Sequence, residues 1–489
     1  MLGDMQLAAL IGTDALRLPE EGATEILGLT ADSRAVKPGY LFAALPGTKL
    51  DGSAFIGQAL EKGAAALLVP LNTNVDARVP VVAHRNPRRM LARMAARFFG
   101  AQPEVIAAVT GTNGKTSVAT FLRQIWTALG EEAASLGTLG ISTAKGERPL
   151  GYTTPDPVSL QAELAGLAKE GVTHLAMEAS SHGLAQYRMD GARVMAAGFT
   201  NITRDHMDYH PSFDDYLYAK LRLFGEVMGP GGVAVINADT AQFAEFEAVS
   251  WARGHRVISV GRKGRDICLA ATRTHPRGQA LELVHGGHNY EVELPLVGGF
   301  QASNALVAAG LAIGCGGEAA KVFAALEHLA GARGRMEEAA HLRNGASVYI
   351  DYAHTPDALE NVLEAMRPHT SGRLSVVFGC GGDRDPGKRG MMGEVAARLA
   401  DAVFVTDDNP RSENAGAIRA AILKGCPGAT EIGDRAAAIE TAMRALREGD
   451  VLVVAGKGHE TGQIIGAETV YFSDHEAVLA AAENIGGGK

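Results

Sequence analysis

A short glycine-rich loop between an apolar strand and an amphipathic helix constrains this sequence more than any other feature. Residues 105–109 are apolar and predict a buried strand. After the loop, apolar residues recur at i, i+3, i+4, i+7, i+8 and i+11 from Val118 to Leu129, which predicts a helix that ends at Gly130. Such a strand–loop–helix unit is typical of parallel α/β folds.

The loop has the composition of a phosphate-binding loop. It comprises Thr110, Gly111, Thr112, Asn113, Gly114, Lys115 and Thr116, followed by Ser117. Its glycines let several N–H groups face one anion, and the helix N-terminus adds partial positive charge. Lys115 can reach the outer phosphates, and the Thr116 hydroxyl suits Mg²⁺. Val109 replaces the first glycine of the usual pattern, so an ordinary turn with an incidental lysine is the alternative to ATP binding.

The length and the alternation of elements predict several α/β domains. A chain of 489 residues is too long for one core and predicts about three domains. From Val105 onward, β-rich runs alternate with alanine-rich helical stretches, the pattern of parallel α/β layers. The glycine-rich stretch 331–335 is interpreted as a domain boundary. The expected domains are residues 1–98, 99–332 and 333–489.

Composition excludes several classes of function. The net charge of -9 argues against nucleic-acid or anionic-membrane binding. The chain has no apolar run of about 18 residues and no basic N-terminal segment, so neither a membrane span nor a signal peptide is expected. The four cysteines (Cys268, Cys315, Cys380 and Cys426) form no CxxC pair, which predicts a reduced, cytoplasmic protein.

A lysine lies within the apolar stripe of a predicted helix, residues 212–228. The stripe contains Phe213, Tyr216, Leu217, Phe224 and Val227, and Lys220 lies at i+7 from Phe213. One interpretation is a half-buried lysine whose ammonium extends to water. The other is that burial lowers the pKa of Lys220, so that the neutral amine reacts with CO₂ to give a carbamate able to hold Mg²⁺.

Two polar clusters follow predicted elements of the central region. Glu178 ends the apolar run 175–177, where open α/β sheets bind ligands, and could complete an Mg²⁺ shell begun by Thr116. The alternative is a solvated acid at a strand end. The segment 205–210 offers imidazoles at His206 and His210. Zinc is disfavoured without HExxH or cysteine partners, which favours a single histidine serving magnesium or substrate.

Three loops in the last third each follow a predicted strand, 374–378, 403–406 or 451–455. The loops are 381–384, 408–411 and 456–460, and parallel strands would gather them at one sheet edge. Arg384 and Arg411 can bind carboxylates bidentately, while Asp408 and Glu460 can bind ammonium groups. The set predicts a site for a zwitterionic amino acid.

Several longer motifs together resemble the Mur ligase family over essentially the whole chain. They are TGTNGKTS from Thr110, MEASSHGLAQYR from Met177, TRDHMDYH from Thr203, YAKLRLF from Tyr218, DYAHTPD from Asp351, GKGHE from Gly456 and the block 32–52. The resemblance implies an α/β fold with three domains. These are a small N-terminal UDP-substrate domain, a central P-loop ATPase domain with a parallel sheet, and a C-terminal Rossmann-like domain for the incoming amino acid. The loop near Gly47 lacks a histidine that some relatives have, which puts one uridine contact in doubt.

The resemblance also implies residue roles. Lys115 and Thr116 would bind ATP phosphates and Mg²⁺, and Glu178, His206 and carbamylated Lys220 would complete the magnesium sites. Asn304, Arg335 and Asp351 would hold the nucleotide. Ser33, Thr153, Thr154, Ser180, Gln186, Arg188, Lys220 and His354 would contact the UDP-muramoyl substrate. Arg384, Asp408, Asn409, Pro410, Arg411, Gly456 and Glu460 would bind the amino acid, and the DNPR run at 408–411 resembles the diaminopimelate-adding type.

The predicted reaction is ATP-dependent addition of meso-2,6-diaminopimelate to the D-glutamate γ-carboxyl of UDP-N-acetylmuramoyl-L-Ala-D-Glu, through an acyl phosphate. The expected protein is a monomer that binds only small molecules. One rival is the lysine-adding ligase of the same family, from which DNPR distinguishes the chain. Another is folylpolyglutamate synthase, which lacks the block 32–52. A P-loop regulatory NTPase and a non-catalytic UDP-sugar-binding protein are the alternatives from other classes.

Overall fold

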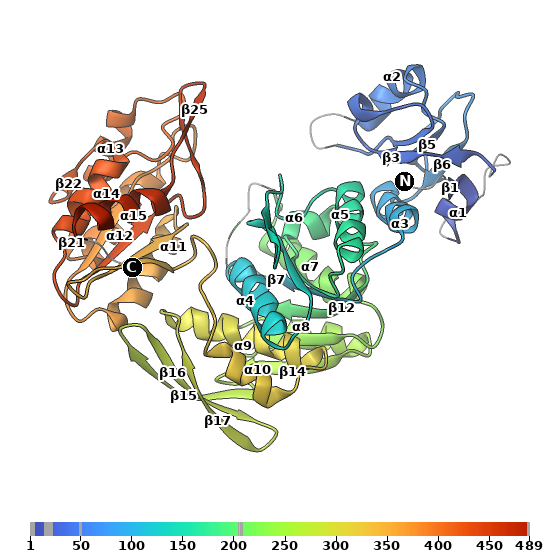
Figure 1. Ribbon diagram of the computed structural model, residues 1–489. Helices are drawn as coiled ribbons and strands as arrows, with labels where there is room; N and C mark the ends of the chain where they lie inside the picture. The colour runs from blue at the N-terminus through green and yellow to red at the C-terminus, as the bar shows by residue number, and fades with distance from the viewer. Residues whose placement is uncertain (1–4, 14–22, 48–50, 204, 206–208, 487–489) are drawn as a thin grey trace. The chain divides into compact units, whose positions relative to one another are not determined.

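The computed structural model describes residues 5–13, 23–47, 51–203, 205 and 209–486. The chain forms two compact units, and Figure 1 labels their helices and strands. Unit 1 comprises Met1–Ser259 with Gly310–Gly317, and unit 2 comprises Val260–Ala309 with Glu318–Lys489. Each unit is described by itself. Among the described residues, no helix has the length and apolar character needed to cross a membrane.

Unit 1 begins with a small parallel sheet of order β3-β4-β5-β6. Its elements are β1 (Met5–Gln6), α1 (Leu7–Ile11), β2 (Glu25–Ile26), β3 (Gly28–Thr30), η1 (Ser33–Ala35), β4 (Tyr40–Ala43), η2 (Gly52–Phe55), α2 (Ile56–Glu61), β5 (Ala66–Pro70), β6 (Val81–His84) and α3 (Pro87–Phe99). The α3 helix begins where Asn86 accepts a hydrogen bond from the N–H of Arg89 and proline occupies the first turn. Its apolar face packs on one side of the sheet, and α2 packs on the other.

The same unit contains the central sheet, whose strands run in the order β10-β9-β8-β11-β7-β12-β13-β14. They are β7 (Val105–Thr110), β8 (Ala133–Gly137), β9 (Gly140–Thr143), β10 (Gly146–Arg148), β11 (His174–Glu178), β12 (Val194–Phe199), β13 (Val233–Asn237) and β14 (Arg256–Gly261). The five strands from β8 to β13 in this order pair in parallel. Glu178 pairs with Val109 and Phe199 with Thr110, so the carboxyl ends of β11, β7 and β12 lie side by side.

Five helices of the described part of unit 1 belong to the central domain, and two of them lie where helices were predicted. The five are α4 (Lys115–Ala128), α5 (Pro157–Lys169), α6 (Ser181–Ala185), α7 (Phe213–Arg222) and α8 (Phe243–Ala252). The predicted helix 212–228 is α7, which Ser212 caps through the N–H of Asp215, followed by the π-helical turn η3 (Leu223–Val227). The predicted strand 105–109 and helix 118–129 are β7 and α4.

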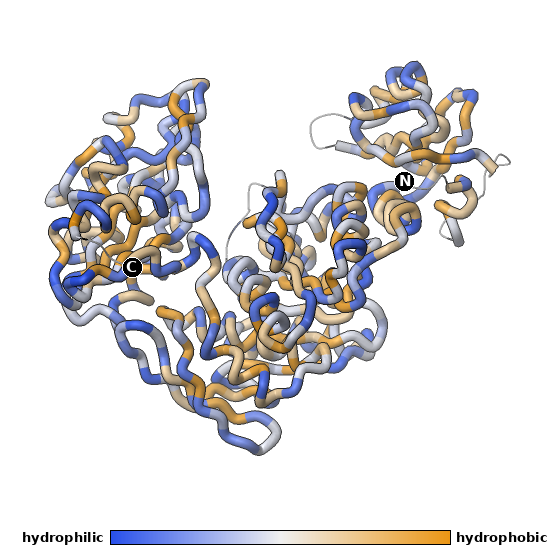
Figure 2. Tube along the Cα trace, in the orientation of Figure 1, coloured by the Kyte–Doolittle hydropathy of each residue, from blue (hydrophilic) through white to orange (hydrophobic). Residues whose placement is uncertain are grey.

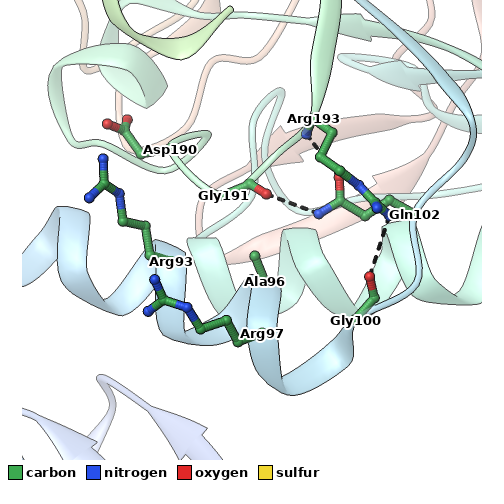
Figure 3. Close-up of a pocket in the computed structure, with 8 residues that line it drawn as sticks. All are labelled: Arg93, Ala96, Arg97, Gly100, Gln102, Asp190, Gly191 and Arg193. Carbon is green, nitrogen blue, oxygen red and sulfur yellow. Dashed lines mark hydrogen bonds between the residues drawn. The ribbon is translucent and has the colours of Figure 1, made fainter. Parts of the chain in front are cut away.

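The α3 helix is fixed to the central domain by close packing and by ion pairs. A Cβ at Gly191 would collide with the carbonyl oxygen of Ala92, so only glycine allows this approach. The buried carboxylate of Asp190 lies 2.9 Å from Arg89 of α3 and 3.0 Å from Arg222 of α7. A polar hollow of about 340 Å³ borders this contact, and Figure 3 shows its lining residues Arg93, Ala96, Arg97, Gly100, Gln102, Asp190, Gly191 and Arg193.

Unit 2 starts with an antiparallel meander that the sequence analysis did not anticipate. It consists of β15 (Ile267–His275), β16 (Gly278–His285) and β17 (His288–Leu294), followed by α9 (Gly299–Gly314), whose last residues belong to unit 1, and α10 (Ala319–Leu326). His285 pairs with His288 across a two-residue turn in which Gly286 and Gly287 have φ of 58° and 80°. Two consecutive positive φ angles match a tight hairpin turn, which joins antiparallel rather than parallel strands.

The rest of unit 2 is a doubly wound domain with sheet order β18-β19-β23-β20-β21-β22. Its strands are β18 (Glu337–His341), β19 (Ser347–Asp351), β20 (Leu374–Phe378), β21 (Ala402–Val405), β22 (Thr430–Glu431) and β23 (Val451–Ala455), and a hairpin of β24 (Gly462–Ile465) and β25 (Glu468–Tyr471) follows. Its helices are α11 (Pro356–Met366), η4 (Arg367–His369), α12 (Lys388–Leu399), α13 (Ala415–Leu423), α14 (Arg435–Arg444) and α15 (Asp474–Asn484). All neighbours except β18 and β19 pair in parallel.

Both faces of this sheet are covered, because successive residues of each strand point to opposite sides. Val451 and Val453 of β23 join the apolar cluster formed with α11, α12 and α13. Leu452 and Val454 join the cluster formed with α14 and α15. Figure 2 shows apolar residues gathered in the strands inside this domain. The three strands predicted before the polar loops are β20, β21 and β23, which lie side by side.

A fully buried ion pair joins α14 to α15. Arg435 donates from Nε and Nη2 to the two oxygens of Asp474, at 2.7 and 2.8 Å, and both side chains are 0% exposed. Replacing Asp474 with alanine would leave the buried guanidinium without its charge partner, so we expect the C-terminal domain to lose about 3–5 kcal/mol of unfolding free energy. Denaturant unfolding measures this loss. The matched control is Arg444→Ala, which breaks the exposed Arg444–Glu440 pair and should cost below about 0.5 kcal/mol. Equal losses in the two variants would contradict the prediction.

Candidate active site

The phosphate-loop candidate lies between β7 and α4 and is held in shape by the residues that follow β12. The N–H of Asn113 donates to Oδ1 of Asn201 at 3.0 Å, and Oγ1 of Thr200 donates to the carbonyl of Asn113 at 2.6 Å. Gly111 has φ of 155°, and a Cβ there would collide with Oγ1 of Thr200. Gly114 is left-handed and directly precedes α4. The loop is therefore a preformed turn at a helix N-terminus, the geometry that binds phosphate.

Two lysines meet at one backbone carbonyl of this loop. The Nζ atoms of Lys115 and Lys220 donate to the oxygen of Gly111 at 2.9 and 2.7 Å. Lys220 is 1% exposed, so its ammonium does not extend to water. Burial lowers the pKa of Lys220 well below its usual value, the charge of Lys115 lowers it further, and Asp205 opposes both. Burial of Lys220 therefore favours its neutral, nucleophilic amine over the ammonium form.

Glu178 is a buried, hydrogen-bonded carboxylate rather than a solvated acid at a strand end. It is 1% exposed, and its two oxygens accept from the N–H and the hydroxyl of Thr138 at 2.8 and 3.1 Å. The Thr138 hydroxyl also lies 3.0 Å from that of Thr153, and Thr154 donates to the Glu178 carbonyl at 3.1 Å. A Cβ at Gly137 would collide with the carboxylate. The absence of a side chain at Gly137 thus makes room for Glu178.

The hydrogen-bonded side chains around Glu178 form a polar row, which continues from Thr154 through three more of the predicted substrate residues. The Ser180 hydroxyl donates to Oγ1 of Thr154 at 3.0 Å, and Arg188 donates to the Thr154 carbonyl at 2.6 Å. Arg188 also donates to Oε1 of Gln186 at 2.8 Å, and Gln186 donates to the hydroxyl of Tyr209 at 3.1 Å. The structure therefore brings together Thr153, Thr154, Ser180, Gln186 and Arg188 beside Glu178.

Three predicted residues belong to other domains of the chain or lie outside the described residues. Ser33 belongs to the N-terminal sheet domain, where its hydroxyl donates to Gln58 at 2.7 Å. His354 is exposed in unit 2, with Nδ1 2.8 Å from the carbonyl of Tyr352. His206 lies outside the residues that the structure describes. Their predicted roles stay predictions.

The predicted nucleotide residues of unit 2 form one connected group. Asn304 donates to Gln301 at 3.1 Å, and Gln301 donates to the carbonyl of Arg335 at 3.4 Å. Asp351 ends β19 and accepts from the N–H of Met336 at 2.8 Å. Burial raises the pKa of Asp351, and the positive charge of Arg335 opposes that rise. The group combines amide, guanidinium and carboxylate side chains.

The three polar loops of the C-terminal domain converge, as their strands predict. The N–H of Gly382 donates to the carbonyl of Asn409 at 2.9 Å, and Arg411 donates to the carbonyl of Gly382 at 2.7 Å. Asn409 also donates to Glu460 at 3.4 Å, so all three loops are linked. Arg384 is exposed at the same edge. These contacts form a preorganised surface with arginines and acids.

The sequence analysis missed several residues that build these sites. Thr138, Thr200 and Asn201 hold Glu178 and the phosphate loop, and each directly follows or lies just beyond a strand of the sheet. Lys457, within the GKGHE run, is 0% exposed and lies against Asp408 and Asn409. Their position after strands was the available signal. Their burial could not be predicted from the sequence, because these residue types are ordinary in exposed turns.

Comparison with known protein families decides the classification. The family model described as Mur ligase middle domain matches residues 109–312. The models described as Mur ligase, glutamate ligase domain, and Mur ligase family, catalytic domain, match residues 334–458 and 25–99. This chain belongs to the Mur ligase family. The three matched segments show its three domains, while the exact boundaries after residues 98 and 332 stay predictions.

Curated Mur ligases resemble this chain over nearly its whole length. A protein of Bradyrhizobium diazoefficiens is 57% identical over 98% of this chain and 99% of its own length. One of Agrobacterium fabrum is 54% identical over 97% and 96%. Both are named UDP-N-acetylmuramoyl-L-alanyl-D-glutamate--2,6-diaminopimelate ligase. A solved structure of that title is 32% identical, with a TM-score of 0.75 over 99% of each chain.

A more distant Mur ligase-like structure shows the fold alone. Folylpolyglutamate synthase of Mycobacterium tuberculosis is 21% identical, with a TM-score of 0.60, and covers 74% of this chain. The higher identity and coverage of the diaminopimelate ligases separate this chain from that rival. As a Mur ligase, the chain is an ATP-dependent acid–amino-acid ligase.

The lack of space for a side chain at Gly137 allows the position of Glu178 to be tested. We expect Gly137→Ala to displace the carboxylate and lower ligase turnover by about 10²-fold, because an error near 1 Å in a catalytic group has that effect. Steady-state kinetics measures the loss. The control is Gly166→Ala in α5, where an added Cβ meets open space and turnover should be unchanged. Full turnover of Gly137→Ala would show that the position of Glu178 does not matter.

Proposed function

We propose that this chain joins 2,6-diaminopimelate to the D-glutamate γ-carboxyl of UDP-N-acetylmuramoyl-L-Ala-D-Glu, with cleavage of ATP to ADP and phosphate. The observation that carries the proposal is the meeting of Lys115 and Lys220 at the phosphate loop, in a domain that also contains the buried Glu178 and its polar row. The names of relatives that are 57% and 54% identical support the same substrates. We further propose a cytoplasmic monomer.

The chemistry follows two displacements. An oxygen of the γ-carboxylate attacks the γ-phosphorus of ATP, the bond to ADP breaks, and an acyl phosphate forms. The neutral amine of diaminopimelate then attacks the acyl carbon, loses a proton and expels phosphate. The first step brings two anions together, so Lys115, at the end of the phosphate loop, lowers the repulsion by placing its ammonium beside the outer phosphates.

Oxygen donors that suit Mg²⁺ lie at the carboxyl ends of β7 and β11. The Thr116 hydroxyl and the Glu178 carboxylate are hard ligands of the kind this ion prefers, and both side chains are largely buried. Bound there, Mg²⁺ would neutralise charge on the triphosphate. His206, outside the described residues, is a further proposed ligand.

Lys220 is suited to carry a carbamate. Its neutral amine can attack CO₂, forming an N–C bond and releasing a proton, and the product presents two oxygens in place of an ammonium. Burial favours the neutral amine. The carbamate would then add an anionic oxygen donor next to the phosphate loop, where Mg²⁺ and the UDP-muramoyl substrate are proposed to bind.

The arginines of the C-terminal loops support diaminopimelate over lysine. Diaminopimelate carries a second carboxylate, and Arg411 and Arg384 offer guanidinium groups for it. Lysine would leave those groups without a carboxylate partner, which a site built for hydrogen bonds rejects strongly. Asp408 and Glu460 would receive the ammonium group at the same end of the ligand.

The carbamate proposal predicts chemical rescue. Replacing Lys220 with alanine removes the amine, and we expect turnover to fall by at least about 10²-fold, since the loss includes a ligand of the catalytic metal. Added formate or acetate should restore part of the activity by supplying the missing carboxylate oxygens. The control is Lys424→Ala at an exposed position, which should be neither impaired nor stimulated. Full activity of Lys220→Ala without any added acid would rule out the carbamate role.

Phosphate release tests the proposed reaction directly. With ATP and UDP-N-acetylmuramoyl-L-Ala-D-Glu, we expect rapid release only when meso-diaminopimelate is present, together with a matching mass increase of the nucleotide product. L-Lysine should be used at least about 10²-fold less efficiently, because it lacks the second carboxylate. A preference for lysine would refute the amino-acid assignment. Release that is independent of both substrates would instead indicate a P-loop regulatory NTPase.

A further inference from the structure

A fully buried lysine lies directly behind the acids proposed to receive the amino acid. Lys457, the second residue of the GKGHE run, is 0% exposed. Its Nζ lies 3.5 Å from Oδ1 of Asp408, 3.3 Å from Oδ1 of Asn409 and 3.8 Å from Oε2 of Glu460. One ammonium group therefore faces the two carboxylates and the amide of the proposed pocket, without contacting solvent itself.

Lys457 sets the direction of the Asn409 amide. The Asn409 oxygen accepts from Lys457 and from the N–H of Ile464 at 3.0 Å. With both donors on the oxygen, the NH₂ group is left to donate to Glu460, at 3.4 Å. Removing the ammonium would free the amide to rotate and would release its contact with the acid.

Lys457 and Arg435 are buried cations near these acids, and Lys457 is the one whose nitrogen pairs with both carboxylates, at 3.5 and 3.8 Å. Arg435 is bound to Asp474 through two hydrogen bonds and acts on Asp408 and Glu460 through its charge alone. Asp408 is 6% exposed and cannot rely on water to screen its charge. Asp408, Glu460 and Lys457 together carry one net negative charge, which matches a single ligand ammonium. With Arg384 and Arg411 included, the formal charge of the pocket is +1.

We propose that Lys457 is a specificity-determining positioning residue of the amino-acid pocket. It aligns Asp408, Asn409 and Glu460, and its charge makes the pocket repel an amino-acid end that is a bare cation. The zwitterionic end of diaminopimelate has no net charge and is accepted, whereas the free end of lysine carries +1 and is disfavoured. This inference rests on the proposed function and deepens it.

The test compares Lys457→Met and Lys457→Arg with the wild-type protein and with Lys424→Met, a control at an exposed lysine. For Lys457→Met we expect the KM for diaminopimelate to rise about tenfold or more, and the diaminopimelate-to-lysine ratio of kcat/KM to fall by a similar factor. The KM values for ATP and the UDP-muramoyl substrate should stay within about twofold, because those sites are distinct. Lys457→Arg should recover most of the selectivity.

Four outcomes separate the possibilities. An unchanged diaminopimelate-to-lysine ratio of kcat/KM in a folded Lys457→Met protein would overturn the proposal. A lower kcat together with higher KM values for all three substrates would also overturn it, because that pattern indicates a merely structural role. If Lys457→Met fails to fold, Lys457→Gln keeps a polar group and is judged by the same ratio. A wild-type protein that does not use diaminopimelate would refute the proposed function itself.

Discussion

Two ammonium groups on one backbone carbonyl form the constraint on which the rest of the central domain depends. The Gly111 oxygen receives both Lys115 and Lys220, whose helices α4 and α7 are separate in sequence. Like charges so placed, one of them fully buried, favour the loss of a proton from the buried one. The arrangement requires Gly111 to lie at the end of β7 with β12 beside it, because Thr200 and Asn201 hold the loop. The parallel strand order thus leads directly to the chemistry of Lys220.

Local elements and the existence of both candidate sites could be predicted from the sequence, since periodicity and loop composition are local signals. The predicted polar loops converge because carboxyl ends of parallel strands share one edge. The contact between Thr138 and Glu178 could not be predicted, because it joins residues 40 positions apart through the strand order. Nor could the burial of Lys457, since a lysine between two glycines is ordinarily an exposed turn residue. The π-turn after α7 likewise depends on tertiary packing. The β15–β17 meander was missed even though Gly286 and Gly287 between two β-rich runs are a local hairpin signal.

The proposed amino-acid pocket combines buried charge with a strained backbone. Arg411 has φ of 53°, a left-handed conformation that is unfavourable for a side chain of this size. Its N–H donates to the Ile464 carbonyl at 2.9 Å, and its carbonyl accepts from Gly466 at 2.7 Å. The β24–β25 hairpin therefore holds Arg411 in a conformation that the residue would not adopt alone. Strain maintained by neighbouring structure is characteristic of binding sites.

The fully buried cations Arg435 and Lys457 of the C-terminal domain differ in how closely they approach their partners. Arg435 and Asp474 pair at 2.7–2.8 Å, and both side chains are 0% exposed, so the pair is a structural tie shielded from ligands. The contacts of Lys457 with Asp408, Asn409 and Glu460 are longer, at 3.3–3.8 Å, so the carboxylates keep lone pairs for another donor. A buried ionic group adds less stability than a well-packed apolar one. The looser contacts of Lys457 therefore argue for a role in recognition, because a purely structural cation would pair as closely as Arg435 does.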